Sequence, residues 1–307
     1  MPIAAAPRAL IDAASELILG KRSRIELALT CLIAGGHLLI EDVPGTGKTT
    51  LAHVLARLFG LDFRRVQFTS DLLPADILGV SVFERESGGF RFHPGPVFTQ
   101  VLLADEVNRA TPRTQSALLE AMEEHQVSVE GETRRLPEPF FVIATQNPAS
   151  QIGTYPLPES QLDRFLMRIG IGYPDPQAER ELLLRGTDSD RGASVNTILS
   201  VDDLVTMRQA AHEVSLSPLL LDYIQRLIAH TRTHEDYHFG LSPRGSIAVV
   251  RAARTWAFME GRSHAVPEDV QTILPAVVEH RLRASSDSDG RTGSALVHRL
   301  LRDVDVF

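Results

Sequence analysis

The chain has 307 residues, of which 43% are hydrophobic and 23% are charged, a composition typical of a globular protein that is long enough for two domains. Its formal net charge of −8 argues against a general nucleic-acid binder, because contacts to a phosphate backbone require an excess of positive charge. A single cysteine, Cys31, excludes an internal disulfide framework and fits a reducing compartment.

No apolar run of the sequence approaches the roughly 18 residues that a membrane-spanning helix needs. The first residues also lack the basic start and long apolar core that are typical of a signal peptide. We therefore expect a cytoplasmic protein without a transmembrane segment.

The first half of the chain alternates helical and strand patterns. Apolar residues at helical spacing predict four helices, at 10–18, 25–36, 48–59 and 112–125. Short apolar runs predict five buried strands, at 37–41, 64–68, 101–106, 140–145 and 166–174. Residues 126–137 alternate around a glycine, as in a hairpin. Strands that alternate with helices predict an α/β fold, with a mostly parallel sheet covered on both faces.

The second half of the chain has only helical patterns. They predict helices at 178–186, 201–212, 218–232, 243–260 and 267–282, with a polar separator at 186–194 and a loop or locally disordered segment at 285–293. We therefore place a boundary near residue 173, between an α/β domain at 1–173 and a helical domain at 174–307. Cys31 and Trp256 lie on apolar helix faces and are expected in the core.

The stretch "EDVPGTGKTT", at 41–50, follows a predicted strand and opens a predicted helix. Glycines there let successive N–H groups point at an anion beside the positive end of the helix. Lys48 would reach the β- and γ-phosphates of a nucleotide, and the Thr49 hydroxyl would bind magnesium. One departure is Asp42, which stands where the strict pattern has a glycine; the alternative is an ordinary strand-to-helix turn. The predicted phosphate loop consists of Pro44, Gly45, Thr46, Gly47, Lys48, Thr49 and Thr50.

Two further strand ends carry polar residues that suit nucleotide hydrolysis. In "VLLADEVNRA", Asp105 can hold magnesium through its carboxylate, and Glu106 can orient or deprotonate the attacking water. A chance Asp-Glu pair is the alternative. In "FFVIATQNP", the neutral amides of Gln146 and Asn147 could hold that water or contact the γ-phosphate, although Asn-Pro is also a plain turn signal.

With these pieces in this order, the chain resembles an AAA+ ATPase, and more closely the MoxR branch. The similarity extends over most of the chain, in the segments "HLLIEDVPGTGKTTLAH", "QFTSDLLPADILGVSVFE", "FHPGPVFTQVLLADEVNRATPRTQSALLEAMEEHQVSVEG", "FFVIATQNPASQIGTYPLPESQLDRFLMRI" and "LSPRGSIAVVRAARTWAFMEGR". The resemblance implies a P-loop core, with a parallel five-stranded sheet between helices, followed by an all-helical lid domain. It also implies that residues 68–84 form an insert within the second helix of the core.

The resemblance also assigns roles to residues outside the phosphate loop. Asn147 looks like the first sensor, and Gly20 resembles the segment that lines the adenine. Arg164 is similar to the arginine finger, which reaches the ATP of a neighbouring subunit, and Arg244 looks like the second sensor on the lid. For each arginine, the alternative is a surface ion pair of little energetic value.

An arginine finger that acts on a neighbour implies an assembly, and the family implies a ring, most often a hexamer. The resemblance further implies an ATP hydrolase that uses ATP and Mg²⁺ to remodel or mature a protein target, as a chaperone does. The partner would often be a separate protein with a von Willebrand factor A domain, and no nucleic acid is expected. Arg109 and Arg113 follow Glu106 closely and could face the adjacent subunit or be plain surface charges.

Two alternative functions remain open: a nucleic-acid motor related to replicative helicases, and a chelatase-type metal-insertion ATPase. The acidic charge and the lack of an added DNA-binding module weigh against the motor, and the chelatase differs mainly in its partner. Arg134 and Arg135, on the predicted hairpin, could line a central pore and grip a peptide or a nucleic acid.

The stretch "HEDYH", at 234–238, matches the histidine spacing of zinc proteases, and His230 adds a third histidine at helical spacing. Zinc binding would need all three side chains on one face of a continuous helix. The residues that follow indicate a helix end, so we interpret this stretch as a solvated surface of the lid.

Overall fold

A computed structural model describes residues 3–86, 88–147, 153–185, 196–285 and 293–306. Its centre is a sheet of five parallel strands, which confirms the predicted sheet. In spatial order, the strands are β2 (Phe63–Gln67), β5 (Val101–Asp105), β8 (Phe141–Gln146), β1 (His37–Glu41) and β9 (Phe165–Ile169). Because all five strands run in the same direction, their carboxyl ends meet at one edge of the sheet and their amino ends at the other.

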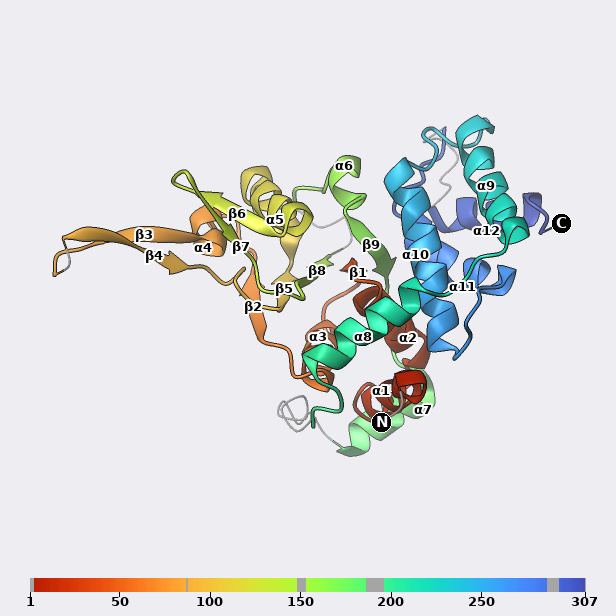
Figure 1. Cartoon of the computed structure of the whole chain (residues 1–307), viewed down its shortest axis with the longest axis horizontal. Coiled ribbons are helices and arrows are strands. Elements are labelled where there is room, and N and C mark those ends of the chain that lie inside the picture. The colour runs from red at the N-terminus through yellow and green to blue at the C-terminus, as the bar shows by residue number, and fades with distance from the viewer. Residues whose placement is uncertain (1–2, 87, 148–152, 186–195, 286–292, 307) are drawn as a thin grey trace.

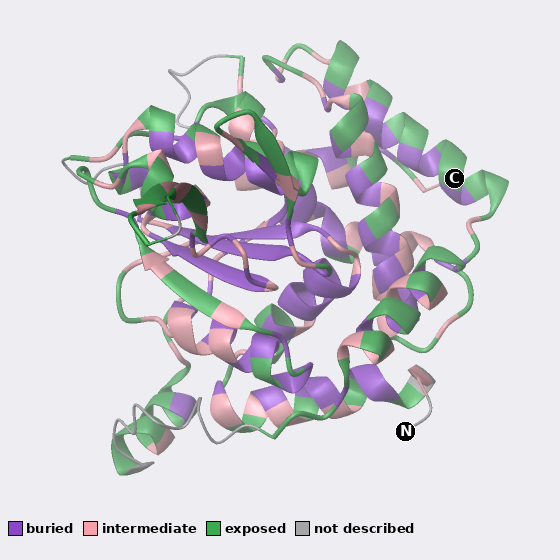
Figure 2. Ribbon diagram, turned by 60° about the vertical axis from the view of Figure 1, so that its left-hand side comes forward, coloured by how far each residue is buried: buried purple, intermediate pink, exposed green. Residues whose placement is uncertain are grey.

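Successive residues of each central strand point to opposite faces of the sheet, so each face has its own apolar core. Leu38 and Ile40 of β1 pack on one side, and Leu39 packs on the other. Buried strands lie between helical layers in Figure 2. The first side is covered by α1 (Ala6–Leu17, preceded by η1, Ile3–Ala5), α2 (Arg22–Ile33) and α3 (Lys48–Leu58); the second is covered by α4 (Pro74–Leu78) and α5 (Pro112–Glu124).

Two hairpins extend from the second side. The predicted hairpin is formed by β6 (Gln126–Val129) and β7 (Glu132–Arg135). The resemblance predicted only an insert at 68–84. The structure has α4 and then a hairpin of β3 (Gly79–Glu84) and β4 (Gly89–Pro94), which reaches far from the sheet (Figure 1). Its strands pack little against the core, and Phe83 and Phe90 pack on each other, with ring centroids 5.4 Å apart.

The strand predicted at 166–174 was too long. The strand β9 ends at Ile169, and Gly172 takes a φ of +70°, which a strand does not adopt. Between β8 and β9 lies the short helix α6 (Glu159–Leu162), and η2 (Val107–Arg109) follows β5.

In the described part of the second half, helices dominate, and the only strand-like pairs are two isolated bridges. Ser217 and Ser242 each accept a hydrogen bond from the first turn of a helix that starts with proline, which explains two of the starts. The helices are α7 (Pro176–Arg185), α8 (Val201–His212), α9 (Pro218–Thr233), α10 (Pro243–Met259), α11 (Pro267–Val278) and α12 (Gly293–Asp303). The last was not predicted. The polar segment expected at 186–194, and residues 286–292 of the loop expected at 285–293, lie outside the described residues.

The helices of the second half pack directly on the core domain. Helices α8 and α10 contact α2, and α11 contacts β9, so one apolar core continues from the sheet into the lid. Cys31 is buried there, as expected, and Trp256 is partly buried against the same core. Among the described helices, none is long and apolar enough to cross a membrane.

Candidate active site

The predicted phosphate loop lies between the end of β1 at Glu41 and the start of α3 at Lys48. Gly45 and Gly47 have φ values of +84° and +89°, which favour glycine. A Cβ atom added at either position would meet nothing within 4 Å, so the space beside the loop is open. The loop therefore fits a phosphate chain, and the N-terminus of α3 faces the same edge of the sheet.

The Lys48 ammonium group lies folded over the loop. Its Nζ donates hydrogen bonds of 2.7 Å to the carbonyl oxygen of Val43 and 3.1 Å to that of Asp42. Thr46 donates to the Val43 carbonyl oxygen as well, while Thr49 and Thr50 lie in the first turn of α3. Lys48 is thus positioned by the loop itself, beside the place where phosphate oxygens would bind.

Asp42 occupies the position that the strict pattern gives to glycine, and its carboxylate links two segments. It accepts 2.8 Å and 2.5 Å hydrogen bonds from the backbone N–H groups of Val43 and Gly172. Gly20, expected at the adenine, has a φ of +68°, and a Cβ atom there would come within 2.9 Å of Asp175 and Ala178. The phosphate loop and Gly20 therefore both lie against the segment that follows β9.

Asp105 ends β5 and is buried. Its Oδ1 accepts a 2.5 Å hydrogen bond from the Thr145 hydroxyl group of β8, and its Oδ2 pairs with the Arg65 guanidinium of β2 at 2.6 Å. Thr145 also accepts a 2.8 Å hydrogen bond from the backbone N–H of Glu106. Sequence reasoning missed Thr145 and Arg65, whose proximity follows only from the strand order β2-β5-β8.

The Glu106 carboxylate is held from three sides. Its Oε1 accepts a 3.1 Å hydrogen bond from the Asn147 side chain, and its Oε2 accepts a 2.9 Å hydrogen bond from Gln67 and pairs with Arg109 at 3.2 Å. The backbone of Glu106 has a φ of +56°, which is uncommon for a residue with a side chain. The structure thus brings Asn147 to Glu106, and Arg109 is paired within its own subunit. Gln146 lies beside them and donates to Glu41 instead.

Arg164 and Arg244 lie together, and both pair with Glu123 near the end of α5. Arg164 binds one carboxylate oxygen of Glu123 at 2.7 Å and also donates to the Leu119 carbonyl oxygen, while Arg244 pairs with the other carboxylate oxygen. Sequence reasoning missed Glu123, which a helical pattern alone marks as a plain surface residue.

The sheet register places this arginine pair at the edge opposite the phosphate loop. Phe165, which follows Arg164, lies beside His37 at the amino end of β1, whereas the loop follows the carboxyl end. With roughly 3.3 Å per residue, the length of β1 separates them by about 13 Å or more. Neither arginine is therefore placed to contact a phosphate on its own loop.

A buried ion pair anchors this arginine cluster to the lid. Arg281 contacts Asp163 at 2.7 Å and donates to backbone carbonyl oxygens that include Phe165 O, at 2.6 Å. The second oxygen of Asp163 accepts a 2.9 Å hydrogen bond from Ser242, the residue that caps α10. Burial lowers the pKa of Arg281, and the Asp163 carboxylate opposes that shift. Asp163 therefore fixes Arg164, its neighbour in sequence, against the start of the helix that carries Arg244.

Three other predicted positions have plain environments. Arg134 pairs with Glu132 at 2.5 Å, and its guanidinium lies 4.0 Å from the centre of the Phe92 ring, so it joins the two hairpins. Arg135 and Arg113 are exposed.

The histidine pattern at 234–238 lacks the helix that zinc proteases need. Helix α9 ends at Thr233, so His234 and His238 lie beyond it. The His230 and His234 rings stack on each other with centroids 4.6 Å apart, and His234 pairs with Asp236 at 3.3 Å. We therefore interpret these histidines as residues of the lid surface.

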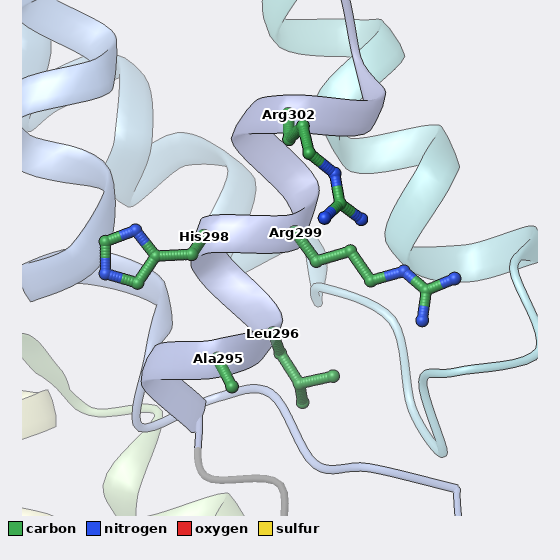
Figure 3. A pocket seen from close by; sticks show the side chains of 5 residues that line it. All are labelled: Ala295, Leu296, His298, Arg299 and Arg302. Carbon is green, nitrogen blue, oxygen red and sulfur yellow. The ribbon is translucent and has the colours of Figure 1, made fainter.

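A cavity of about 510 Å³ beside α12 is also basic (Figure 3). Its arginines already have carboxylate partners: Arg299 pairs with Asp236 at 2.5 Å and with Asp303 at 3.1 Å, and Arg302 pairs with Asp303 at 2.9 Å. In Figure 3 Arg299 and Arg302 extend to one side of the helix and His298 to the other, and because both arginines are already paired with carboxylates they are not free to bind an anion.

Comparison with known proteins shows the family of the chain. Residues 37–167 match the family model of the ATPases associated with various cellular activities (AAA), and residues 229–300 match the AAA lid domain. The chain is 40% identical over 300 residues to chaperone MoxR1 of Mycobacterium tuberculosis, covering 94% of this chain and 79% of that one. The chain belongs to the MoxR-type AAA+ ATPases.

Two other proteins are similar to the chain over nearly its full length. YeaC of Bacillus subtilis, an uncharacterised protein, is 40% identical over 96% of this chain and 93% of its own. An inferred ATPase from Cytophaga hutchinsonii has a solved structure that matches with a TM-score of 0.90 and 36% identity, over 99% of this chain and 95% of that one. The P-loop core and helical lid are thus those of the family, and the chain is an ATP hydrolase.

Proposed function

We propose that this MoxR-type ATPase works as a hexameric ring, in which each nucleotide lies between two subunits. The observation that carries the proposal is the position of Arg164 and Arg244 at the edge of the sheet opposite the phosphate loop. Arginines at that distance serve catalysis only on the ATP of an adjacent subunit. The family resemblance gives the number of subunits.

Within one subunit, the loop glycines and Lys48 bind the triphosphate, and Gly20 lines the adenine. Thr49 and Asp105 lie at the carboxyl edge of the sheet and have the oxygen ligands that Mg²⁺ prefers, so they would hold the ion. When bound, Mg²⁺ supplies neutralisation of charge on the β- and γ-phosphates. Arg65, which now pairs with Asp105, would have to release the carboxylate or share it.

Glu106 orients the attacking water and accepts its proton, and Asn147 holds the carboxylate in place through its 3.1 Å hydrogen bond. Charge then builds on the transferred phosphoryl group, and a guanidinium group from the neighbour stabilises it. Arg164 supplies this guanidinium, with Arg244 beside it. A single subunit therefore holds only part of a complete catalytic site.

The work of the ring, in this proposal, is the remodelling or maturation of a protein target. The relative from Mycobacterium tuberculosis is named a chaperone, which supports this over the alternatives. A separate partner with a von Willebrand factor A domain, a cytoplasmic location and the division into domains at 1–173 and 174–307 also remain proposals. The net charge of −8 continues to weigh against a nucleic-acid motor.

The dependence of ATP hydrolysis on assembly tests this function. We expect the hydrolysis rate per subunit to rise steeply with protein concentration, in step with ring formation followed by analytical ultracentrifugation at each concentration. A rate per subunit that is the same for monomers and rings would refute a nucleotide site shared between subunits.

A further inference from the structure

A cavity lies beside Arg164 and Arg244. It has a volume of about 420 Å³ and lies between the amino edge of the sheet, the end of α5 and one face of α10. Four arginines line it, whereas its only carboxylates are Glu123 and Asp163: the arginines are Arg164, Arg244, Arg251 and Arg281.

Three of these arginines have carboxylate partners. Arg164 and Arg244 share Glu123, and Arg281 pairs with Asp163. The side chain of Arg251 forms no ion pair or hydrogen bond with any of the described residues. Arg251 is exposed to solvent and lines the cavity. Desolvation by the surrounding protein atoms lowers the pKa of its guanidinium group.

Arg251 lies on the same face of α10 as Arg244. Residues Arg244, Ala248 and Arg251 are spaced by four and three positions, so their side chains emerge on one side of the helix, and all three line the cavity. Seven residues of helix rise by about 10 Å. The two guanidinium groups can therefore contact different parts of one extended anion.

A second cation beside Arg251 makes its surroundings still more positive. Arg208 of α8 donates a 3.1 Å hydrogen bond to the Leu32 carbonyl oxygen, but its Nε has no partner among the described residues. Burial, followed by the charge of Arg251, lowers the pKa of Arg208 to about 10. Neither guanidinium group forms an ion pair with a described carboxylate, so an anion bound beside Arg251 would meet a positive environment.

We propose that Arg251 is a third arginine that contacts the polyphosphate of the neighbouring subunit's nucleotide, together with Arg164 and Arg244. This inference rests on the proposed shared site. A triphosphate carries several negative charges along its length, and guanidinium groups bind phosphate oxygens in pairs of hydrogen bonds. Such an anion would neutralise Arg251, which pairs with neither Glu123 nor Asp163.

The test compares Arg251→Ala with Arg254→Ala, a variant of the same helix outside the cavity. Assembled Arg251→Ala should bind ATP, measured by calorimetry with Mg²⁺, within about twofold of the wild type, because its own phosphate loop is intact. Its kcat should fall by about tenfold or more, as expected when one contact to a transferring phosphoryl group is lost. Arg254→Ala should keep its kcat, and Arg251→Lys should recover part of the lost rate.

Mixed rings separate a contact in trans from a folding defect. Lys48→Ala subunits should bind ATP more weakly but carry an intact Arg251, so their addition to Arg251→Ala should raise the rate above the sum of the two separate rates. Wild-type kcat in Arg251→Ala, or no gain on mixing while Arg164→Ala does gain, would overturn the role of Arg251.

Two further outcomes also overturn the inference, and they can be told apart. Loss of rings by Arg251→Ala, seen by ultracentrifugation without nucleotide, would show an ion pair with a carboxylate of the neighbour instead. No gain for Arg164→Ala either would remove the shared site itself, and with it both the proposed function and the role of Arg251.

Discussion

Arg65 of β2 pairs with Asp105 of β5 at 2.6 Å, so the carboxylate that should hold magnesium already contacts a cation. Removal of this competing charge should favour the metal ion. We expect Arg65→Ala to reach half-maximal ATP hydrolysis at a Mg²⁺ concentration about threefold or more below that of the wild type. The neighbouring Arg64 is exposed and serves as the control, with Arg64→Ala unchanged. A higher Mg²⁺ requirement in Arg65→Ala would show that Arg65 supports the site instead.

Glu106→Gln should separate binding from turnover. The amide keeps the size of the side chain and can still contact Asn147 and Gln67, but it cannot accept a proton from water. We expect ATP affinity close to that of the wild type, with hydrolysis reduced by about a hundredfold or more. Calorimetry and a phosphate-release assay measure the two quantities, and hydrolysis at the wild-type rate would exclude Glu106 as the base.

Asp163→Asn should destabilise the chain, because it leaves the Arg281 side chain, which is only 4% exposed, without its carboxylate. Loss of one partner of a buried pair costs about 3 kcal/mol, whereas the exposed pair of Arg22 and Asp12 is worth less than about 1 kcal/mol. Urea unfolding of Asp163→Asn and Asp12→Asn compares the two. Equal losses of unfolding free energy would show that the Asp163 pair does not anchor the lid.

His37 makes stability depend on acid. Burial lowers the pKa of His37 to about 3, from an ordinary value of 6.5, with the charges of His125, Arg251 and Arg208 adding to the effect. Below pH 6.5 the imidazole of His37 is therefore protonated in the unfolded chain, whereas it stays neutral in the folded chain down to about pH 3. The free energy of unfolding falls as the pH falls through this window.

Between pH 7 and pH 5, His37 alone should lower the free energy of unfolding by about 2 kcal/mol. Its Nδ1 accepts a hydrogen bond from the Val142 N–H, an interaction that His37→Asn can retain. Urea unfolding at both pH values should show a smaller pH effect in His37→Asn than in His264→Asn, a variant of an exposed histidine. The same pH effect in both variants would contradict a buried neutral His37.

The parts of the site that depend on adjacent residues were predictable from the sequence. The phosphate loop and the Asp105–Glu106 pair each follow a buried strand, and local backbone chemistry fixes their roles. The parallel sheet also followed, because alternating strands and helices leave few other arrangements. Strand order is different, since it depends on contacts between distant segments. Arg65, Gln67 and Thr145 therefore looked unremarkable until β2, β5 and β8 were seen side by side.

The β3–β4 hairpin and helix α12 were missed for other physical reasons. The β3–β4 hairpin exposes large apolar side chains such as Val82 and Phe90, so its alternation does not mark a buried face. Helix α12 follows a polar segment that hides its start, although Leu296, Val297 and Leu300 have helical spacing and are buried. Glu123 gave no signal either, because its role depends on two arginines brought to it from the start of β9 and from the lid.

A complementation experiment with two inactive variants tests the shared nucleotide site most directly. Arg164→Ala retains its phosphate loop but lacks the arginine, and Lys48→Ala retains the arginine but lacks the ammonium group that binds phosphate. Alone, each should hydrolyse ATP about a hundredfold or more slowly than the wild type. When they are mixed, sites that combine the loop of one with the arginine of the other should restore a clear fraction of the wild-type rate. A mixture that is no more active than its components, at every ratio and with rings present, would contradict catalysis in trans.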